Sequence, residues 1–204
     1  MLPEMSNKEV DIEKVAERAL ADKDLLSELL DGLKLKNETI RYNCSKVLNL
    51  ISEQHGEVLY PEWQYFVDFL GSQNTYWKLS ASLIIANLTS VDVEHRFEKI
   101  FDKYYQLLDD KSMIAAIYAA RSSGKIVRAK PALETEITNR LLNIDETHHE
   151  PGRKDLIKAG IIEAFSEYYE TAEDKAKIIE FVREQLENDS PKTRKTAKEF
   201  LSRL

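Results

Sequence analysis

An all-α fold is predicted for this chain of 204 residues, specifically an α-solenoid of about five stacked antiparallel helical hairpins with one extra helix before them. Apolar residues recur with helical spacing, and no window alternates with a period of two for long enough to form a strand. A shared pattern of cap, apolar stripe and basic residue also returns every 36–44 residues, which is typical of stacked repeats. We expect residues 1–8 to be flexible and residues 9–204 to form a single domain.

Prolines and polar caps divide the chain into short helices joined by a few residues. Pro61, Pro131 and Pro191 each suit the first turn of a helix, where the missing N–H has no intrahelical acceptor. In chain order, the predicted helices span 9–21, 23–34, 38–53, 61–71, 75–89, 92–108, 111–128, 131–143, 153–169, 172–188 and 191–203.

Three columns of the sequence share one register and define the repeats. The apolar stripe is first seen at Ile40, Cys44, Val47, Leu48 and Ile51, and it returns from Trp77, Ile157 and Thr193. A weaker third stripe comprises Met113, Ile117, Ala120, Arg121 and Gly124. The expected cap positions are Asn37, Asn74, Asp110, Lys154 and Ser190. The positions directly after each stripe begins are Arg41, Lys78, Ile114, Lys158 and Arg194. Because the last stripe runs to Leu204, we expect the last helix to be packed down to its end.

The motifs Asn37-Glu-Thr-Ile-Arg41, Asn74-Thr-Tyr-Trp-Lys78 and Ser190-Pro-Lys-Thr-Arg194 resemble those of HEAT repeats over about residues 23–204. The pattern departs from them at Ile114 and Lys154. The resemblance implies that the second helix of each hairpin lines an inner, concave surface, and HEAT-like proteins are expected to bind other macromolecules. Each hairpin is too small to bury its own apolar face, so neighbours must stack.

Charge is unevenly distributed between the two sets of helices. Residues 38–51, 75–90, 111–130, 153–170 and 191–204 hold 16 Lys/Arg and 6 Asp/Glu, whereas the rest of the chain holds 13 and 30, within a net charge of −7. We therefore expect a basic inner face on an acidic body, which would bind a protein with an acidic surface. The candidate partner-binding residues are Arg41, Lys78, Arg121, Lys125, Lys158, Arg194 and Lys198. The alternative is that these cations complement helix dipoles or pair with acidic groups of neighbouring repeats.

No catalytic residue, metal site, cofactor or small-molecule substrate is predicted. His148 and His149 lack the spacing that aims two imidazoles at one ion, and we expect them in a solvated loop with Pro151 and Gly152 as turn residues. Cys44 holds a stripe position and is expected to be an inert core thiol. No glycine motif of a nucleotide-binding or hydrolase site is present.

The alternative function is nucleic-acid binding, because the repeats have some architectural likeness to the HEAT-like DNA glycosylases that remove alkylated purines. The nearest counterparts of that family's tryptophan-lined cleft and catalytic aspartate are Trp63, Trp77 and Asp68. Trp63 and Asp68 lie five residues apart and so on different faces of a helix, and the chain is acidic overall. The catalytic residues of that family are therefore not transferred to this sequence.

Composition excludes further classes of protein. One cysteine excludes a disulfide framework and favours a reducing, cytoplasmic location. No stretch approaches the roughly 18 apolar residues of a membrane span, so no membrane contact is expected. Among the aromatic residues, we expect Tyr65 and Tyr76 to face outward, and one ring of the pair Tyr104–Tyr105 to face solvent.

Overall fold

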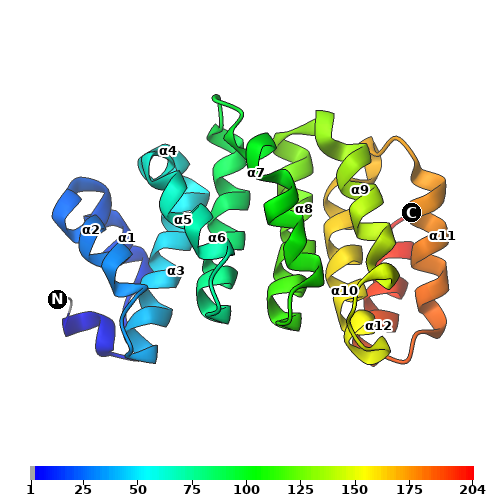
Figure 1. Cartoon of the computed structure of the whole chain (residues 1–204), viewed down its shortest axis with the longest axis horizontal. Coiled ribbons are helices and arrows are strands. Elements are labelled where there is room, and N and C mark those ends of the chain that lie inside the picture. The colour runs from blue at the N-terminus through cyan, green and yellow to red at the C-terminus, as the bar shows by residue number, and fades with distance from the viewer. Residues whose placement is uncertain (1–2) are drawn as a thin grey trace.

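The computed structural model describes residues 3–204 and forms a row of antiparallel helices, with the N-terminal helices at one end and the C-terminal helices at the other (Figure 1). An N-terminal 3₁₀ turn, η1 (Pro3–Ser6), and helix α1 (Ile12–Ala21) precede the hairpins. The first helices of the hairpins are α2 (Lys23–Gly32), α5 (Trp63–Leu70), α7 (Arg96–Tyr105), α9 (Glu134–Leu142) and α11 (Lys175–Glu184). The second helices are α3 (Glu38–Gln54), α6 (Thr75–Leu88), α8 (Met113–Ala129), α10 (Pro151–Tyr168) and α12 (Pro191–Leu201).

The α-solenoid predicted from the sequence is confirmed. Each second helix packs on the next, so that α3, α6, α8, α10 and α12 form one continuous row, and α1 packs on α3. One additional short helix, α4 (Gly56–Leu59), precedes α5. Within residues 3–204, no helix is both long and apolar enough to cross a bilayer.

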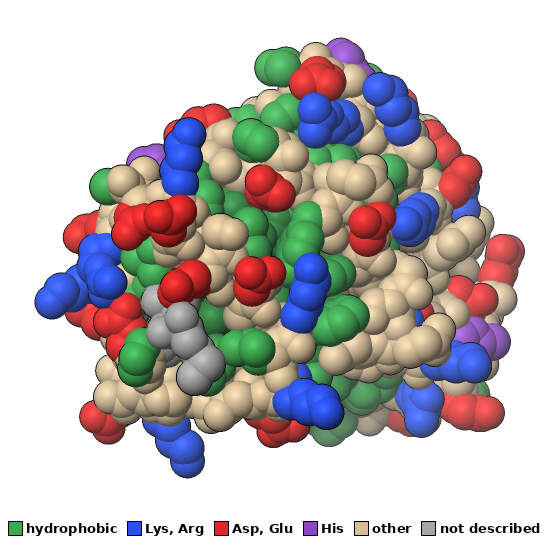
Figure 2. Space-filling model, turned by 60° about the vertical axis from the view of Figure 1, so that its left-hand side comes forward, with side chains coloured by type: hydrophobic (Ala, Val, Ile, Leu, Met, Phe, Trp, Pro, Cys, Tyr) green, Lys and Arg blue, Asp and Glu red, His purple; other side chains and the backbone are tan. Residues whose placement is uncertain are grey.

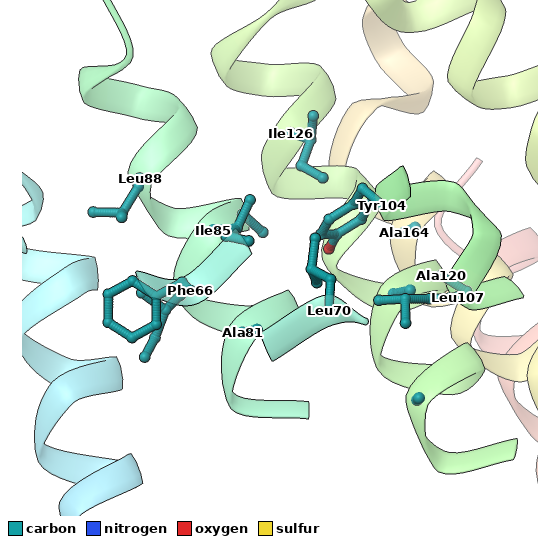
Figure 3. Close-up of a cluster of buried hydrophobic side chains, with 14 of the residues drawn as sticks. Phe66, Leu70, Ala81, Ile85, Leu88, Tyr104, Leu107, Ala120, Ile126 and Ala164 are labelled. Carbon is teal, nitrogen blue, oxygen red and sulfur yellow. The ribbon is translucent and has the colours of Figure 1, made fainter. Parts of the chain in front are cut away.

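The hydrophobic core continues from one repeat into the next. Figure 3 shows Phe66 and Leu70 of α5, Ala81 and Ile85 of α6, and Tyr104 of α7 among the side chains of one buried cluster. Because consecutive hairpins share these side chains, every interior repeat depends on its neighbours for burial of its apolar surface.

Three of the five expected caps are confirmed. The side chains of Asn37, Asn74 and Ser190 each accept a hydrogen bond from a backbone N–H in the first turn of α3, α6 and α12. Pro191 occupies the first turn of α12, while Pro61 and Pro131 lie in short 3₁₀ turns before α5 and α9.

The third repeat differs from the predicted register by two residues. Ser112, and not Asp110, caps α8, while Asp110 accepts from the Ser112 N–H in the preceding turn. The buried stripe of α8 consequently contains Ala115, Ala119, Ser122, Ser123 and Ile126. Arg121, placed in the stripe by the sequence pattern, is exposed.

Three further expectations at helix ends are wrong. Pro151 and Gly152 are the first residues of α10 and not turn residues, because a proline needs no intrahelical acceptor at that position. Glu150 precedes α10 without making a side-chain cap, so Lys154 lies within the helix. At the end of the chain, α12 stops at Leu201 and Leu204 is exposed.

The N-terminal segment, for which the sequence predicts flexibility over residues 1–8, is described from residue 3 onward, and residues 1–2 of that prediction lie outside the described residues. Met5 is fully buried, and the Asn43 amide of α3 donates to the backbone carbonyls of Met5 and Asn7, both at 2.9 Å. The segment therefore covers the end of α3.

Candidate functional site

The second helices present one shared surface, which we call the second-helix face. Helical spacing places Tyr42 and Glu53 on the same side of α3, and Arg121 and Lys125 on the same side of α8. Contacts then join these helices into one surface. Lys125 Nζ lies 2.7 Å from Glu53 Oε1 and 2.8 Å from Asn87 Oδ1, so this ion pair reaches from α8 to α3 across α6. Tyr76 of α6, Glu163 and Glu167 of α10, and Lys192 of α12 also belong to the second-helix face.

Lys78 and Lys158 belong to the predicted basic column and are held by carboxylates at the ends of the hairpins. Lys78 is buried and bonds to Asp110 of the next repeat. Lys158 Nζ lies 2.9 Å from Asp145 Oδ2 in the turn before its own helix. Both ammonium groups are largely withdrawn from solvent.

Arg41 and Arg194, the two arginines of the same column, make matching contacts in the first and last hairpins. Each guanidinium donates to the backbone carbonyl six residues earlier, Arg41 to Leu35 at 3.2 Å and Arg194 to Asn188 at 2.6 Å. Arg194 also donates to the Asp189 carbonyl at 3.0 Å. These arginines thus stabilise the turn between the two helices of a hairpin.

The cations of α8 alternate with acidic side chains of neighbouring second helices. Arg121 Nε lies 3.0 Å from Glu163 Oε2, and Arg128 Nη2 lies 3.3 Å from Glu167 Oε2. Glu163 also faces Lys192 of α12 at 3.7 Å. Of the seven candidate residues, Arg121 and Lys198 have side chains that are mostly exposed. The second-helix face is therefore a mosaic of charges, with exposed cations at a few places.

An apolar hollow of about 490 Å³ lies between α3 and α6 on the second-helix face. Tyr42 is 58% exposed and Tyr76 is 55% exposed, and both line it together with Leu79. Below them, the hydroxyls of Ser45 and Ser80 are 2.7 Å apart and join the two helices. We call this feature the tyrosine hollow; its lining residues are Lys8, Glu38, Thr39, Arg41, Tyr42, Asn43, Ser45, Tyr76, Leu79 and Ser80.

Both tyrosine rings of the hollow are supported by cations. The Arg41 guanidinium lies 4.7 Å from the centre of the Tyr76 ring, and Lys46 Nζ lies 4.5 Å from that of Tyr42. Such cation–π contacts favour one orientation of an exposed ring. The outward position expected for Tyr76 is confirmed, whereas Tyr42 was not among the predicted site residues.

A second hollow, of about 410 Å³, brings together some of the residues considered for nucleic-acid chemistry. Trp77 and Asp68 both line it, but Trp63 is buried elsewhere against Tyr60. Trp77 stacks on Phe69 and donates its indole N–H to the Leu33 carbonyl at 2.7 Å. Asp68 accepts from Gln64 at 2.8 Å. The three residues therefore do not converge on one cavity.

A buried ionic network joins the second and third repeats around Lys130, the residue that follows α8. Its Nζ lies 2.9 Å from both Asp92 and Glu98, and the Asp92 side chain is fully buried. Asp92 also accepts from the Tyr60 hydroxyl at 2.6 Å and from the N–H groups of Arg96 and Phe97 at the start of α7. Burial alone would raise the pKa of Asp92, but these donors and Lys130 lower it below its usual value.

The histidine pair fastens the turn before α10 to the previous repeat. His148 donates its backbone N–H to Asp109 at 2.7 Å, and its ring contacts the same carboxylate. The His149 ring is buried, and its Nε2 lies 3.0 Å from the Leu108 carbonyl oxygen, while Nδ1 has no hydrogen-bond partner among the residues that the structure describes. Burial lowers the pKa of His149. Among residues 3–204 no three His, Cys, Asp or Glu side chains are grouped so as to hold a metal ion.

The single cysteine is enclosed in the core. Cys44 is fully buried, and burial raises the pKa of its thiol to about 12. The thiolate, which is the nucleophilic form, is therefore strongly disfavoured at neutral pH.

No protein-family model matches this chain, and no curated protein matches it. Among solved structures it is similar to a designed armadillo repeat protein in complex with the peptide (KR)4, with a TM-score of 0.53, 15% identity and 98% of each chain covered. A second designed armadillo repeat protein gives a TM-score of 0.51 at 14% identity, with 99% of each chain covered. At such identities the likeness shows the fold, a helical-repeat solenoid. Armadillo and HEAT units contain two or three helices, and here α4–α6 supplies three while α7–α8 supplies two.

Proposed function

We propose that this protein is a non-catalytic scaffold that binds a protein partner across the second-helix face. The tyrosine hollow carries the proposal, because two large side chains more than half exposed at one place are costly unless a partner covers them. Tyrosine and arginine are among the residue types that most often anchor a protein interface, and Arg41 lines the hollow with its guanidinium 4.7 Å from the centre of the Tyr76 ring. A solved neighbour of similar fold is itself in complex with a peptide.

We further propose that the partner presents an acidic surface to this face. Support comes from the cations of the second helices whose side chains remain exposed, among them Lys198 and Arg121, although Arg121 also pairs with Glu163. Lys78, Lys158 and Arg194 would contribute by shaping the hairpin ends, since their charged groups are already bonded within the chain.

Nucleic acid is the weaker candidate. A nucleic-acid backbone requires a stripe of cations without intervening carboxylates. Here Glu53, Glu163 and Glu167 lie among the cations of the second-helix face. A protein surface with separated acidic groups matches that mosaic better.

The test is capture of partners from a cell lysate, with and without nuclease, by the wild-type chain and two double variants. Arg121→Glu with Lys198→Glu reverses the exposed cations of the second helices, and Lys99→Glu with Lys103→Glu reverses two exposed lysines of α7 as a matched control. We expect nuclease-resistant capture of a protein by the wild type and the control, and its loss in the first variant. Salt-labile recovery of nucleic acid, or equal capture by all three forms, would contradict the proposal.

A further inference from the structure

We propose that the tyrosine hollow takes one hydrophobic side chain from an acidic peptide segment, with the flanking carboxylates of that segment lying on the basic rim. This inference rests on the proposed function and specifies its ligand. It names the chemistry at one place on the second-helix face: an aromatic or leucine side chain between Tyr42 and Tyr76.

The shape of the hollow suits such a side chain. Its volume of about 490 Å³ leaves room for one aromatic or leucine side chain together with part of the segment that carries it. Its apolar lining is the two tyrosine rings and Leu79, and its polar lining includes Ser45 and Ser80, whose hydroxyls bond to each other. An apolar wall with a polar rim is the usual anatomy of the centre of a protein interface.

The Tyr42 and Tyr76 rings are already restrained before a ligand binds. Arg41 under Tyr76 and Lys46 beside Tyr42 restrict both rings, so little rotamer freedom is left to lose when a ligand enters. The face that carries the N-terminal repeats shows hydrophobic side chains gathered near its middle, with charged side chains around them (Figure 2).

Charge complementarity selects an acidic segment. Among the described residues, Lys8 and Arg41 line the hollow and Lys46 lies against its Tyr42 ring, while Glu38 is the carboxylate in its lining. Glu38 lies 3.9 Å from Arg41, too far to neutralise it by a hydrogen bond. Lys8 and Lys46 are both exposed. This spot is therefore locally positive on a chain whose net charge is −7, so an acidic segment is attracted here and repelled from most of the remaining surface.

The experiment compares four pools of short fluorescent peptides that differ in two features. The flanking residues are either Asp/Glu or Lys/Arg, and the central residue is either hydrophobic (Phe, Leu or Trp) or Ser. Binding to the full chain is measured by fluorescence anisotropy at low and at moderate salt. We expect only the acidic pool with a hydrophobic centre to bind, and its affinity to fall as salt rises.

Three variants locate the binding. Tyr42→Ser and Tyr76→Ser should each weaken binding by about tenfold or more, because each removes a wall of the hollow. Lys8→Glu with Lys46→Glu should weaken it by a similar factor and remove the salt dependence. Val93→Ser is the matched control, since Val93 is 83% exposed on the turn before α7 and should not affect binding. All four altered side chains on the hollow are exposed, so thermal melting of these variants should match that of the wild type.

Binding of the basic pool, equal binding of the Ser-centred acidic pool, or unchanged affinity in both tyrosine variants would overturn the inference. Absence of binding by every pool would overturn it as well. Failure of the peptide assay is distinguishable from failure of the proposed function. Lysate capture that depends on Arg121 and Lys198 would still show a partner on the second-helix face.

Discussion

At the scale of single residues, two glycines determine how closely the central second helices approach. A Cβ on Gly124 of α8 would lie 2.9 Å from the Ala164 carbonyl oxygen, and one on Gly160 of α10 would lie 3.0 Å from that of Ile117. Both of these atoms belong to the backbone, which cannot turn aside as a flexible side chain could, and the Glu167 Cβ would lie still closer to a Cβ on Gly124, at 2.8 Å. The contact between α8 and α10 therefore leaves no room for a Cβ at Gly124 and very little at Gly160.

Gly124→Ala should consequently destabilise the protein by about 1–3 kcal/mol, the usual cost of overpacking. Gly152→Ala is the matched control, because nothing lies within 4 Å of a Cβ at that first-turn position of α10. The control should be neutral or stabilising by up to about 1 kcal/mol, since alanine is the better helix former. Denaturant unfolding of both variants measures the difference, and equal stability would show that the two helices are not in such close contact.

Lys130 is the second residue whose replacement has a definite expected cost. Lys130→Met would leave the buried Asp92 carboxylate without its cation, which should cost about 3–5 kcal/mol. Lys103→Met, an exposed lysine on α7, should stay within about 0.5 kcal/mol of the wild type. If Lys130→Met unfolds at the wild-type denaturant concentration, the network does not stabilise the fold.

At the scale of helices and turns, the basic column of the sequence is explained by the hairpin ends. Arg41 and Arg194 bond to a carbonyl six residues earlier, and Lys78 and Lys158 bond to carboxylates in turns. The basic residue at this position of the repeats therefore stabilises the turn between helices, in addition to any role on the surface. The sequence could show the column, but its partners depend on how the chain bends between helices.

The turn before α10 should make stability depend on pH through His149. Burial lowers the pKa of this imidazole, so the fold favours its neutral form, and no acceptor faces Nδ1 when it is protonated. The neutral His149 ring contributes its full stabilisation of the fold above about pH 6.5, the pKa of a histidine in the unfolded chain. This stabilisation is lost as the pH falls from that value toward the lower pKa of His149 in the folded protein. The neighbouring His148 and Arg153 act in the same direction, while Asp109 opposes them.

His149→Gln keeps a donor for the Leu108 carbonyl but does not titrate. We therefore expect the melting temperature to fall less between about pH 7.5 and about pH 5.5 in this variant than in the wild type, since a glutamine binds no proton in that range. The measurement is thermal melting in matched buffers at both values. Parallel decreases in the two proteins would mean that His149 does not carry the pH dependence.

Helix positions could be predicted because periodicity and caps are local signals. The wrong details arise where local signals compete. Asp110 and Ser112 are both good caps two residues apart, and only the packing of α8 selects Ser112. Tyr104 and Tyr105 were expected to divide between core and solvent, yet both are buried, because α7 ends there and the Tyr105 hydroxyl reaches Ser123 of α8.

At the scale of the whole molecule, the excess of positive charge on the second helices is a feature of the sequence, but a uniformly basic face is not a feature of the structure. Arg121, Lys125 and Arg128 each pair with a glutamate of another second helix. Such pairing between helices distant in sequence could not be read from composition. It leaves the exposed positive charge confined to a few places, including the rim of the tyrosine hollow.

The hollow itself could be predicted only in part. Periodicity places Tyr42 on the side of α3 opposite the core stripe, and the outward position of Tyr76 was expected on the same kind of evidence. Their convergence depends on the spacing of α3 and α6, which is fixed by the small side chains of Ser45 and Ser80 between them. No local sequence signal encodes that spacing.

The most direct test of the second-helix face as the binding surface is hydroxyl-radical footprinting of side chains with and without the captured partner. Tyr42, Tyr76 and Ile114 are exposed on the second helices, whereas Leu20 and Val93 are exposed away from them. We expect the partner to protect Tyr42 and Tyr76 most strongly and to leave Leu20 and Val93 as reactive as before. Protection of Leu20 or Val93 with the tyrosines unchanged would place the partner on another surface and rule out the second-helix face.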